Sequence, residues 1–239
     1  MRFGKIQYLN LLPFDVFLKQ YPLPSFIKQA AFLKRSYPSK LNQLFLFKQI
    51  DSGFISSIAG RQSHYKHKAT KSGIISNGAV WSVLNINLES KKDFESDTSN
   101  ALSKVLNLHG KVLIGDKALQ FYFNNKDSSF IDMGEEWKKR ENLPFVFGRM
   151  CANKYIDLYK NISLNFNKKP IKIPYFMLKK ASLESNLESK QIKNYLKRIY
   201  YKIGHKELKS LERFYRACRI NNIKSPRRIY KKAKYDSNK

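Results

Sequence analysis

Cysteine is scarce in this sequence, and its scarcity excludes one class of protein. The two cysteines, Cys151 and Cys218, lie far apart in a chain of 239 residues and fit no metal-binding or redox spacing. A secreted scaffold held together by disulfides is therefore excluded. We expect two buried or idle thiols in a reducing compartment.

Long apolar runs are also absent. No stretch approaches the roughly 20 apolar residues that cross a bilayer. The apolar run near the N-terminus is interrupted by Asn10, Pro13 and Asp15, and no small-residue cleavage site follows it. We therefore expect no membrane span and a cytoplasmic location.

Acidic residues are few beside the basic ones: 18 Asp and Glu face 46 Lys and Arg, a formal charge of +28. Such an excess suits the phosphates of nucleic acid. It is spread along the chain, however, since residues 171–239 hold 20 basic and 5 acidic residues and the remainder is also basic. No zinc-finger spacing, RNA-binding aromatic signature or helix-turn-helix is present. We expect a solvated basic exterior and no obligate nucleic-acid partner.

Apolar and aromatic residues are plentiful. They make up 42% and 14% of the chain, which is ample for a packed core. The length suits one large domain or two smaller lobes. The sequence therefore predicts a folded globular protein.

Residues 2–15 predict a strand, a polar turn and the start of a helix. Phe3 to Leu9 form an apolar, aromatic-rich run, and Asn10 stands three residues before Pro13. At the carboxyl edge of an α/β sheet, such turns bind small anions. Asn10 either faces a ligand or simply caps the helix that follows.

Two more segments place small polar residues at the ends of predicted strands. Residues 51–58 form an apolar strand with Ser56 and Ser57 at its carboxyl end. Asn77 and Gly78 give a turn signal before a strand predicted from Val80 to Leu88, long enough to cross between lobes. The two serines either line a ligand edge or belong to an ordinary turn.

Thr98 and Ser99 begin a predicted helix. Either residue can cap it, and its free N–H groups would also suit a carboxylate. Further apolar strands are predicted at residues 111–116, near 130 and at 143–148, alternating with helices. Strands that alternate with helices in this way predict an α/β fold.

His64 and His67 stand three residues apart in a lysine-rich segment. Two histidines at this spacing can share a metal on a helix, but no third ligand lies nearby in the sequence. The alternative is that both face solvent, and we expect that arrangement.

Taken together, these segments resemble the chorismate dehydratase family of the futalosine route to menaquinone. The motifs that carry the resemblance are Tyr-Leu-Asn-Leu-Leu-Pro-Phe at 8–14, Asp-Ser-Gly-Phe-Ile-Ser-Ser-Ile at 51–58, Gly-Ala-Val-Trp-Ser-Val-Leu at 78–84, Thr-Ser at 98–99, Ile-Gly-Asp-Lys-Ala-Leu at 114–119, Asp-Met-Gly-Glu-Glu-Trp at 132–137 and Leu-Pro-Phe-Val-Phe at 143–147. They follow one another in the family's order over most of the chain. Two departures are the Leu-Leu-Pro after Asn10, where the family has Thr-Leu-Pro, and a short segment between residues 85 and 110.

The resemblance implies the two-lobed fold of type II periplasmic binding proteins, with a central cleft between the lobes. We expect lobe one at residues 1–85 and lobe two at 86–175, with the return crossover near 172–175. Residues 176–239 would then return to lobe one with basic C-terminal helices, and the helical register extends over 187–200.

The resemblance also implies a reaction. The family removes water from chorismate to give 3-[(1-carboxyvinyl)oxy]benzoate, driven by aromatisation of the ring and without a metal or redox cofactor. By motif match, Asn10 and Ser82 are the candidate catalytic residues. The candidate substrate-binding residues are Tyr8, Ser56, Ser57, Asn77, Thr98 and Ser99.

The proton acceptor stays open, because none of these candidates is a strong base. The substrate's own enolpyruvyl carboxylate could take the proton, held by Asn10 and Ser82, or Asp116 could act as the protein base. Asp116 also fits a structural helix cap. A solute-binding protein of the same fold, which binds a small anion without converting it, is the alternative function.

Overall fold

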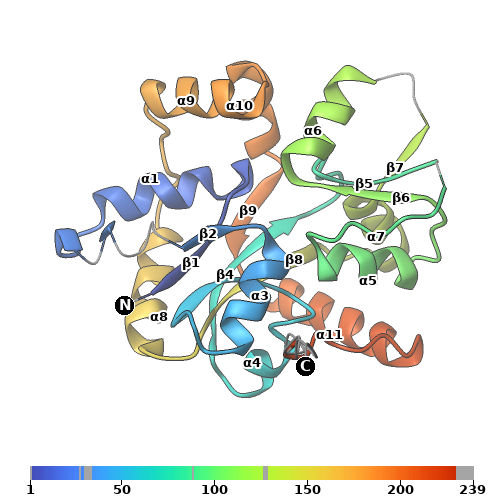
Figure 1. Cartoon of the computed structure of the whole chain (residues 1–239), viewed down its shortest axis with the longest axis horizontal. Helices are drawn as coiled ribbons and strands as arrows, with labels where there is room; N and C mark the ends of the chain where they lie inside the picture. Colours follow the sequence, from blue (N-terminus) through green and yellow to red (C-terminus); the bar gives the residue numbers. More distant parts are fainter. Residues whose placement is uncertain (1, 27, 30–33, 88, 126–128, 230–239) are drawn as a thin grey trace, which may run out of the picture.

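The computed structural model describes residues 2–26, 28–29, 34–87, 89–125 and 129–229, which fold into two lobes of unequal size (Figure 1). Each lobe is built on its own β-sheet. Residues 230–239, the end of the predicted basic C-terminal segment, lie outside the described residues. In the described part of the chain, no helix combines the length and the apolar character needed to cross a membrane.

The larger lobe contains a six-stranded mixed sheet. Its strands are β1 (Phe3–Ile6), β2 (Lys34–Ser36), β3 (Ser52–Ser56), β4 (Ala69–Ser76), β8 (Phe145–Ala152) and β9 (Ile199–Lys202). Across the sheet they follow the order β2-β1-β3-β8-β4-β9. β1 pairs in parallel with β2 and β3, whereas β8 is antiparallel to β3 and β4, and β9 is antiparallel to β4.

The smaller lobe contains a three-stranded antiparallel sheet. Its strands are β5 (Val83–Ile86), β6 (Lys111–Ile114) and β7 (Phe130–Asp132), with β5 in the centre.

Helices pack around both sheets. Those of the larger lobe are η1 (Leu9–Leu11), α1 (Leu12–Gln20), α3 (Pro38–Leu46), α4 (Arg61–Tyr65) and α8 (Ile156–Phe166). Those of the smaller lobe are α5 (Asp97–Val105), α6 (Gly115–Asn124) and α7 (Met133–Glu141). The chain then forms α9 (Tyr175–Ser185), α10 (Ser189–Leu196) and α11 (His205–Ile220).

Aromatic packing fixes the first strand and the first helix in the larger lobe. The ring of Phe14 on α1 stacks on Phe3 of β1 at a centroid distance of 5.6 Å. It meets Phe54 of β3 and Phe166 of α8 edge to face, at 5.1 and 5.0 Å. Such pairs add to the stabilisation that comes from burying their apolar area. The turn between β1 and α1, which carries Asn10, is therefore held between two packed elements.

The expected return to the larger lobe near residues 172–175 is wrong. The strand Phe145–Ala152 pairs with both β3 and β4 of the large sheet. Helix α8 packs on the same lobe, where Tyr159 and Phe166 contact Phe3 and Phe14. The chain therefore returns before Phe145. An apolar strand has the same composition in either sheet, and only its hydrogen-bonded neighbours decide where it belongs.

The C-terminal segment also differs from its expected course. The helical register predicted over residues 187–200 ends at Leu196, and Ile199–Lys202 form the edge strand β9. Helix α11 lies beneath the smaller lobe in Figure 1, and the indole Nε1 of Trp137 on α7 donates to Ser210 Oγ of α11 at 3.1 Å. The segment therefore contacts both lobes, because its apolar faces find partners in each.

The strand expected from Val80 begins later, at Val83. The carboxylate of Asp132 accepts the backbone N–H groups of Val80 and Trp81 at 2.9 and 2.6 Å. Trp81 has a positive φ of 63°, which is incompatible with a strand. Asp132 also caps α7 through the N–H groups of Gly134 and Glu135. One buried carboxylate thus joins the crossover segment to the smaller lobe.

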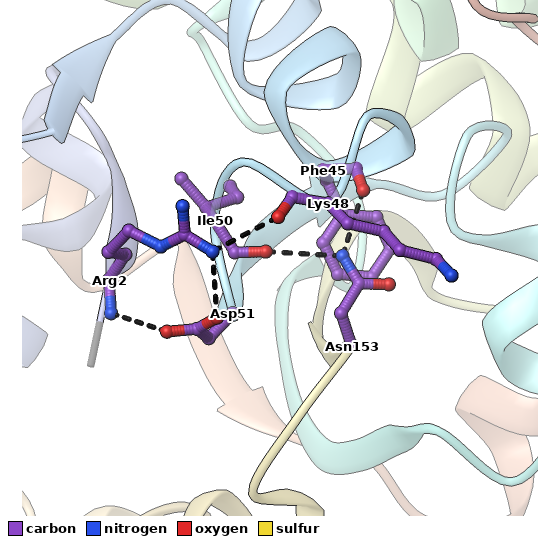
Figure 2. Close-up of polar contacts among 6 residues, drawn as sticks. All are labelled: Arg2, Phe45, Lys48, Ile50, Asp51 and Asn153. Carbon is purple, nitrogen blue, oxygen red and sulfur yellow. Dashed lines mark hydrogen bonds and ion pairs between the residues drawn. The ribbon is translucent and has the colours of Figure 1, made fainter.

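Figure 2 shows the hydrogen bonds that join neighbouring chain segments at one end of the large sheet. The side-chain amide of Asn153, just after β8, donates to the carbonyl oxygens of Phe45 and Ile50 at 2.8 and 3.2 Å. Beside it, Asp51 accepts the backbone N–H of Arg2 at 2.8 Å and pairs with the Arg2 guanidinium at 3.3 Å. These bonds connect the chain start, the exit of α3 and the end of β8.

We expect Asn153→Ala to lower the free energy of unfolding by about 1–3 kcal/mol, because the carbonyls of Phe45 and Ile50, two buried residues, both lose the hydrogen bond from this amide. At about 2–4 °C per kcal/mol, this loss should be clear in thermal melts. Asn221→Ala is the matched control, since among the described residues its side-chain amide donates only to Ala217, on the exposed end of α11. Equal melting temperatures for the two variants would contradict the proposed role of Asn153.

Candidate functional site

A small cavity, with apolar walls and a few polar groups, lies where the two lobes meet. The larger lobe contributes Tyr8, Asn10 and Ser56, and the smaller lobe contributes Ser82, Ser96, Ser99 and Gly115, within walls that include Ile6, Ile74, Val83, Ile114 and Phe147. Its volume is about 50 Å³. Pockets for small organic ligands measure about 300–1,000 Å³, so a ligand of that kind can enter only if the lobes separate.

Asn10 reaches this cavity from the turn η1. Its side-chain Oδ1 is buried and has no hydrogen-bond partner among the described residues. Its backbone carbonyl accepts the Tyr201 hydroxyl at 2.7 Å, which fixes the turn from the side of β9. A buried amide oxygen without a donor is costly unless a ligand or water supplies one. Asn10 therefore faces the cavity with unused hydrogen-bonding capacity.

Three serine hydroxyls in the cavity are arranged as donors. The Oγ of Ser82 accepts from the Tyr195 hydroxyl at 3.0 Å, and that of Ser56 accepts from Asn42 Nδ2 at 2.8 Å. The Oγ of Ser99 accepts from Ser96 Oγ at 2.8 Å. Because each oxygen is already engaged by a donor, its own O–H can be offered to a ligand.

Two helices begin at the cavity. Ser96 is the N-cap of α5, where its Oγ accepts the N–H of Ser99 at 3.1 Å, and Gly115 is the first residue of α6. Helix starts carry a partial positive charge and leave N–H groups without intrahelical partners. The expected cap at Thr98 or Ser99 is wrong, since Ser96 fills that position.

Three of the residues singled out by motif lie away from the cavity. Ser57 Oγ donates to the Val146 carbonyl at 2.5 Å, and Thr98 Oγ1 accepts the N–H of Ile58 at 3.1 Å. Both bonds hold backbone segments together in the interior. Asn77 is exposed on the turn after β4. The structure therefore brings together Tyr8, Asn10, Ser56, Ser82 and Ser99 but not these three.

Tyr8 and Gly115 form a close contact between the lobes. Gly115 has a φ of +62°, and a Cβ atom there would lie 2.8 Å from three carbons of the Tyr8 ring. The Tyr8 hydroxyl donates to Glu95 Oε2 at 2.5 Å. Burial, with the neighbouring Glu95 carboxylate, holds the pKa of Tyr8 well above its usual range. The phenol therefore stays protonated and acts as a donor.

Asp116 lies beside this contact, outside the cavity. Its Oδ1 accepts the backbone N–H of Leu9 at 3.1 Å, and the side chain lines a neighbouring surface pocket with Lys5, Asp15 and Glu184. Burial raises the pKa of Asp116 to about 6, and the hydrogen bond from Leu9 opposes that rise. Asp116 thus joins the start of α6 to the Asn10 turn.

No side chain among the described residues lining the cavity carries a charge. Its polar groups are hydroxyls, an amide and the two helix starts. Such a set suits a carboxylate-bearing ligand bound through neutral donors.

The two histidines of the lysine-rich segment lie outside this cavity. His64 is not solvent-facing as expected, since its Nδ1 lies 2.6 Å from Arg149 Nη1, whereas His67 is exposed. Within the described ranges, no group of three or more His, Cys, Asp and Glu is placed to hold a metal.

Several residues of the site escape motif analysis. Ser96 could have been found from its position three residues before Ser99, a spacing typical of helix caps. Asn42, Tyr195 and Tyr201 gave no such signal, because they reach the site from distant segments and act on Ser56, Ser82 and Asn10 only in the folded chain.

Comparison with known proteins assigns the family. Residues 95–219 match a family model described as menaquinone biosynthesis. The chain is 44% identical over 225 residues to a chorismate dehydratase of Campylobacter jejuni subsp. jejuni serotype O:23/36 (strain 81-176), a match that covers 93% of this chain and 100% of that protein.

Solved structures resemble it in fold. Protein AF1704 from Archaeoglobus fulgidus matches with a TM-score of 0.61 at 12% identity, over 93% of this chain and 97% of that one. The periplasmic aliphatic sulphonate binding protein SsuA from Escherichia coli matches with a TM-score of 0.51 at 12% identity, over 100% and 94%. At such identities the likeness shows the fold alone, and it confirms the expected periplasmic-binding-protein fold.

The raised pKa of Asp116 predicts a pH-dependent stability. The folded state holds this proton up to about pH 6, whereas an unperturbed Asp has a pKa of 3.8, so stability falls as pH rises between these values and stays low above them. Asp116→Asn keeps an acceptor for Leu9 but carries no charge. We expect its melting temperature to exceed that of the wild type by about 2–6 °C at pH 7.5 and by less at pH 5.

Asp157→Asn provides the control, because Asp157 is an exposed residue of α8 that pairs only with Lys160 among the described residues. Its difference from the wild type should not change between the two pH values. If the melting temperature of Asp116→Asn exceeded that of the wild type by the same amount at both pH values, the ionised carboxylate of Asp116 would not be what limits stability.

Proposed function

This chain belongs to the chorismate dehydratase family of menaquinone biosynthesis, and we propose that it converts chorismate to 3-[(1-carboxyvinyl)oxy]benzoate and water. The reaction makes it a carbon-oxygen lyase of the hydro-lyase type. The observation that carries this proposal is the 44% identity to a chorismate dehydratase over nearly the whole of both chains.

The chemistry requires two bonds to break on adjacent ring carbons. A proton leaves the carbon that bears the enolpyruvyl ether, and the hydroxyl group departs from its neighbour. The electron pair of the C–H bond becomes part of the new aromatic ring, and the hydroxyl leaves as water with the released proton. Aromatisation supplies the driving force, so the protein must mainly orient the substrate and assist the departure.

Neutral donors suit both carboxylates of chorismate. In our proposal, the starts of α5 and α6 and the Ser99 hydroxyl hold one carboxylate, by helix-end charge and hydrogen bonds. Ser56 and Tyr8 complete the polar wall on the larger lobe. Neutral partners also avoid the cost of burying a cation when the cleft is closed and no substrate is bound.

Asn10 and Ser82 hold the enolpyruvyl carboxylate in our proposal. Asn10 would donate to this carboxylate through its Nδ2 group, while its buried Oδ1, which has no donor among the described residues, stays open to an O–H group of the ligand. The Ser82 hydroxyl is set as a donor by Tyr195. Held against the ring, this carboxylate accepts the proton within the substrate. Asp116 is a weaker candidate for the base, because its carboxylate is engaged by Leu9 and lines a different pocket.

We expect purified protein to turn chorismate into the enolpyruvyl benzoate, measured by chromatography of the product. A binding protein of the same fold would leave chorismate intact, and that result would overturn the enzyme assignment in favour of anion binding. Calorimetric titration of the same samples with chorismate separates an inactive binder from a protein that does not recognise the molecule.

Asn10→Ala should lower kcat by about 10²–10³, because it removes one preorganised polar contact to the reacting group. Asn77→Ala is the matched control, since Asn77 lies exposed on a turn outside the cavity, and it should keep kcat within about twofold of the wild type. Circular dichroism melts establish that both variants fold. Wild-type kcat in Asn10→Ala would remove Asn10 from the site.

Alanine substitutions at the neighbouring positions Ser99 and Thr98 of α5 should separate an effect on KM from an effect on stability. Ser99→Ala removes a cavity donor, so we expect KM for chorismate to rise about tenfold with little change in melting temperature. Thr98→Ala leaves the N–H of Ile58 without its acceptor, so it should lower stability by about 1–2 kcal/mol while KM stays unchanged. The reverse pattern would place Thr98, and not Ser99, on the substrate.

A further inference from the structure

A second, larger cavity lies in the bigger lobe, away from the cleft. It has a volume of about 780 Å³ and opens between α4, α8 and α11, over strands β4 and β8. In Figure 1 these three helices lie in the lower part of the molecule. None of the described residues that line it lines the cleft cavity. A volume of this size suits a whole small-molecule ligand.

An arginine without a counter-ion among the described residues lies in its wall. Arg149 of β8 is only 6% exposed, and its Nε is buried with no hydrogen-bond partner in that part of the chain. Its Nη2 donates to the Thr70 carbonyl at 2.8 Å, and its Nη1 lies 2.6 Å from His64 Nδ1. Neither partner carries the negative charge that a buried guanidinium requires.

His64 does not supply the missing charge. Burial and the nearby Arg149 lower the pKa of His64, so the imidazole is neutral and its Nδ1 accepts from the guanidinium. Of the described residues, Glu212 contributes the only carboxylate in the wall, and it lies 3.6 Å from His64 Nε2 on a largely exposed side chain. Glu212 therefore lies nearest to the histidine, and Arg149 forms no ion pair among the described residues.

The rest of the cavity wall combines apolar and basic side chains. Tyr65, Leu164 and Leu208 belong to the large apolar side chains that the described structure leaves exposed, and all three line this cavity. Lys71 and Lys160 lie in the same wall. Exposed apolar groups that gather around one concave surface are typical of a ligand-binding site.

We propose that this cavity binds an aromatic carboxylate, whose carboxylate pairs with Arg149 and whose ring lies against Tyr65, Leu164 and Leu208. A carboxylate matches the planar fork of a guanidinium, and it supplies the charge that the described residues lack at this point. The apolar walls then cover the ring. The proposal does not depend on the reaction in the cleft.

The test is calorimetric titration of the full chain with 1-naphthoate, compared with the neutral 1-naphthamide. We expect saturable binding of the acid and about tenfold weaker binding of the amide, because the amide lacks the charge that pairs with Arg149. Equal affinities would show an apolar pocket without an anion site. No saturable binding of 1-naphthoate would overturn the proposal outright.

Variants locate the ligand. Arg149→Met and Leu164→Glu should each weaken 1-naphthoate at least about tenfold, and Leu164 is exposed enough for its variant to fold even if Arg149→Met does not. Leu183→Glu, an exposed leucine of α9 outside this cavity, is the matched control and should bind as the wild type does. Unchanged binding in Leu164→Glu would place the ligand elsewhere.

Two further measurements distinguish binding in this cavity from binding in the cleft. Leu164→Glu should turn over chorismate at the wild-type rate, since Leu164 lies outside the cleft cavity, and Asn10→Ala should bind 1-naphthoate normally. Loss of naphthoate binding in Asn10→Ala would place the ligand in the cleft and refute the second site.

Discussion

The contact of Tyr8 with Gly115 is the constraint on which the candidate site depends. The aromatic ring and the start of α6 approach so closely that only a residue without a side chain fits, and the positive φ of Gly115 makes glycine the natural choice there. The hydrogen bonds from Tyr8 to Glu95 and from Leu9 to Asp116 extend the same contact. Together they bring the Asn10 turn of one lobe against the serines of the other.

The polar groups of the cleft are organised by residues that do not line it. Tyr195 and Asn42 engage the oxygens of Ser82 and Ser56, and Tyr201 holds the backbone of Asn10. This second layer fixes the direction in which each small side chain can donate. A site of neutral donors needs such support, because a hydroxyl rotates freely unless its oxygen is engaged.

Sequence patterns predicted the strand, turn and helix around Asn10, the α/β fold, and the family. These predictions failed where one local sequence pattern is compatible with two different structures. The apolar strand at 145–152 could belong to either sheet, and Ser96, Thr98 and Ser99 could each have capped α5. Strand membership depends on distant hydrogen-bond partners, and a cap depends on the backbone conformation before the first turn.

The sequence by itself determined the family and five residues of the cleft, because the motifs that carry them are local and follow one order along the chain. Tertiary structure alone decided that Ser57 and Thr98 hold backbone segments, that Asp116 joins two lobes, and that Arg149 is buried without a counter-ion among the described residues. The reason is physical. Whether a hydroxyl, a carboxylate or a guanidinium has a partner depends on atoms brought close only by folding.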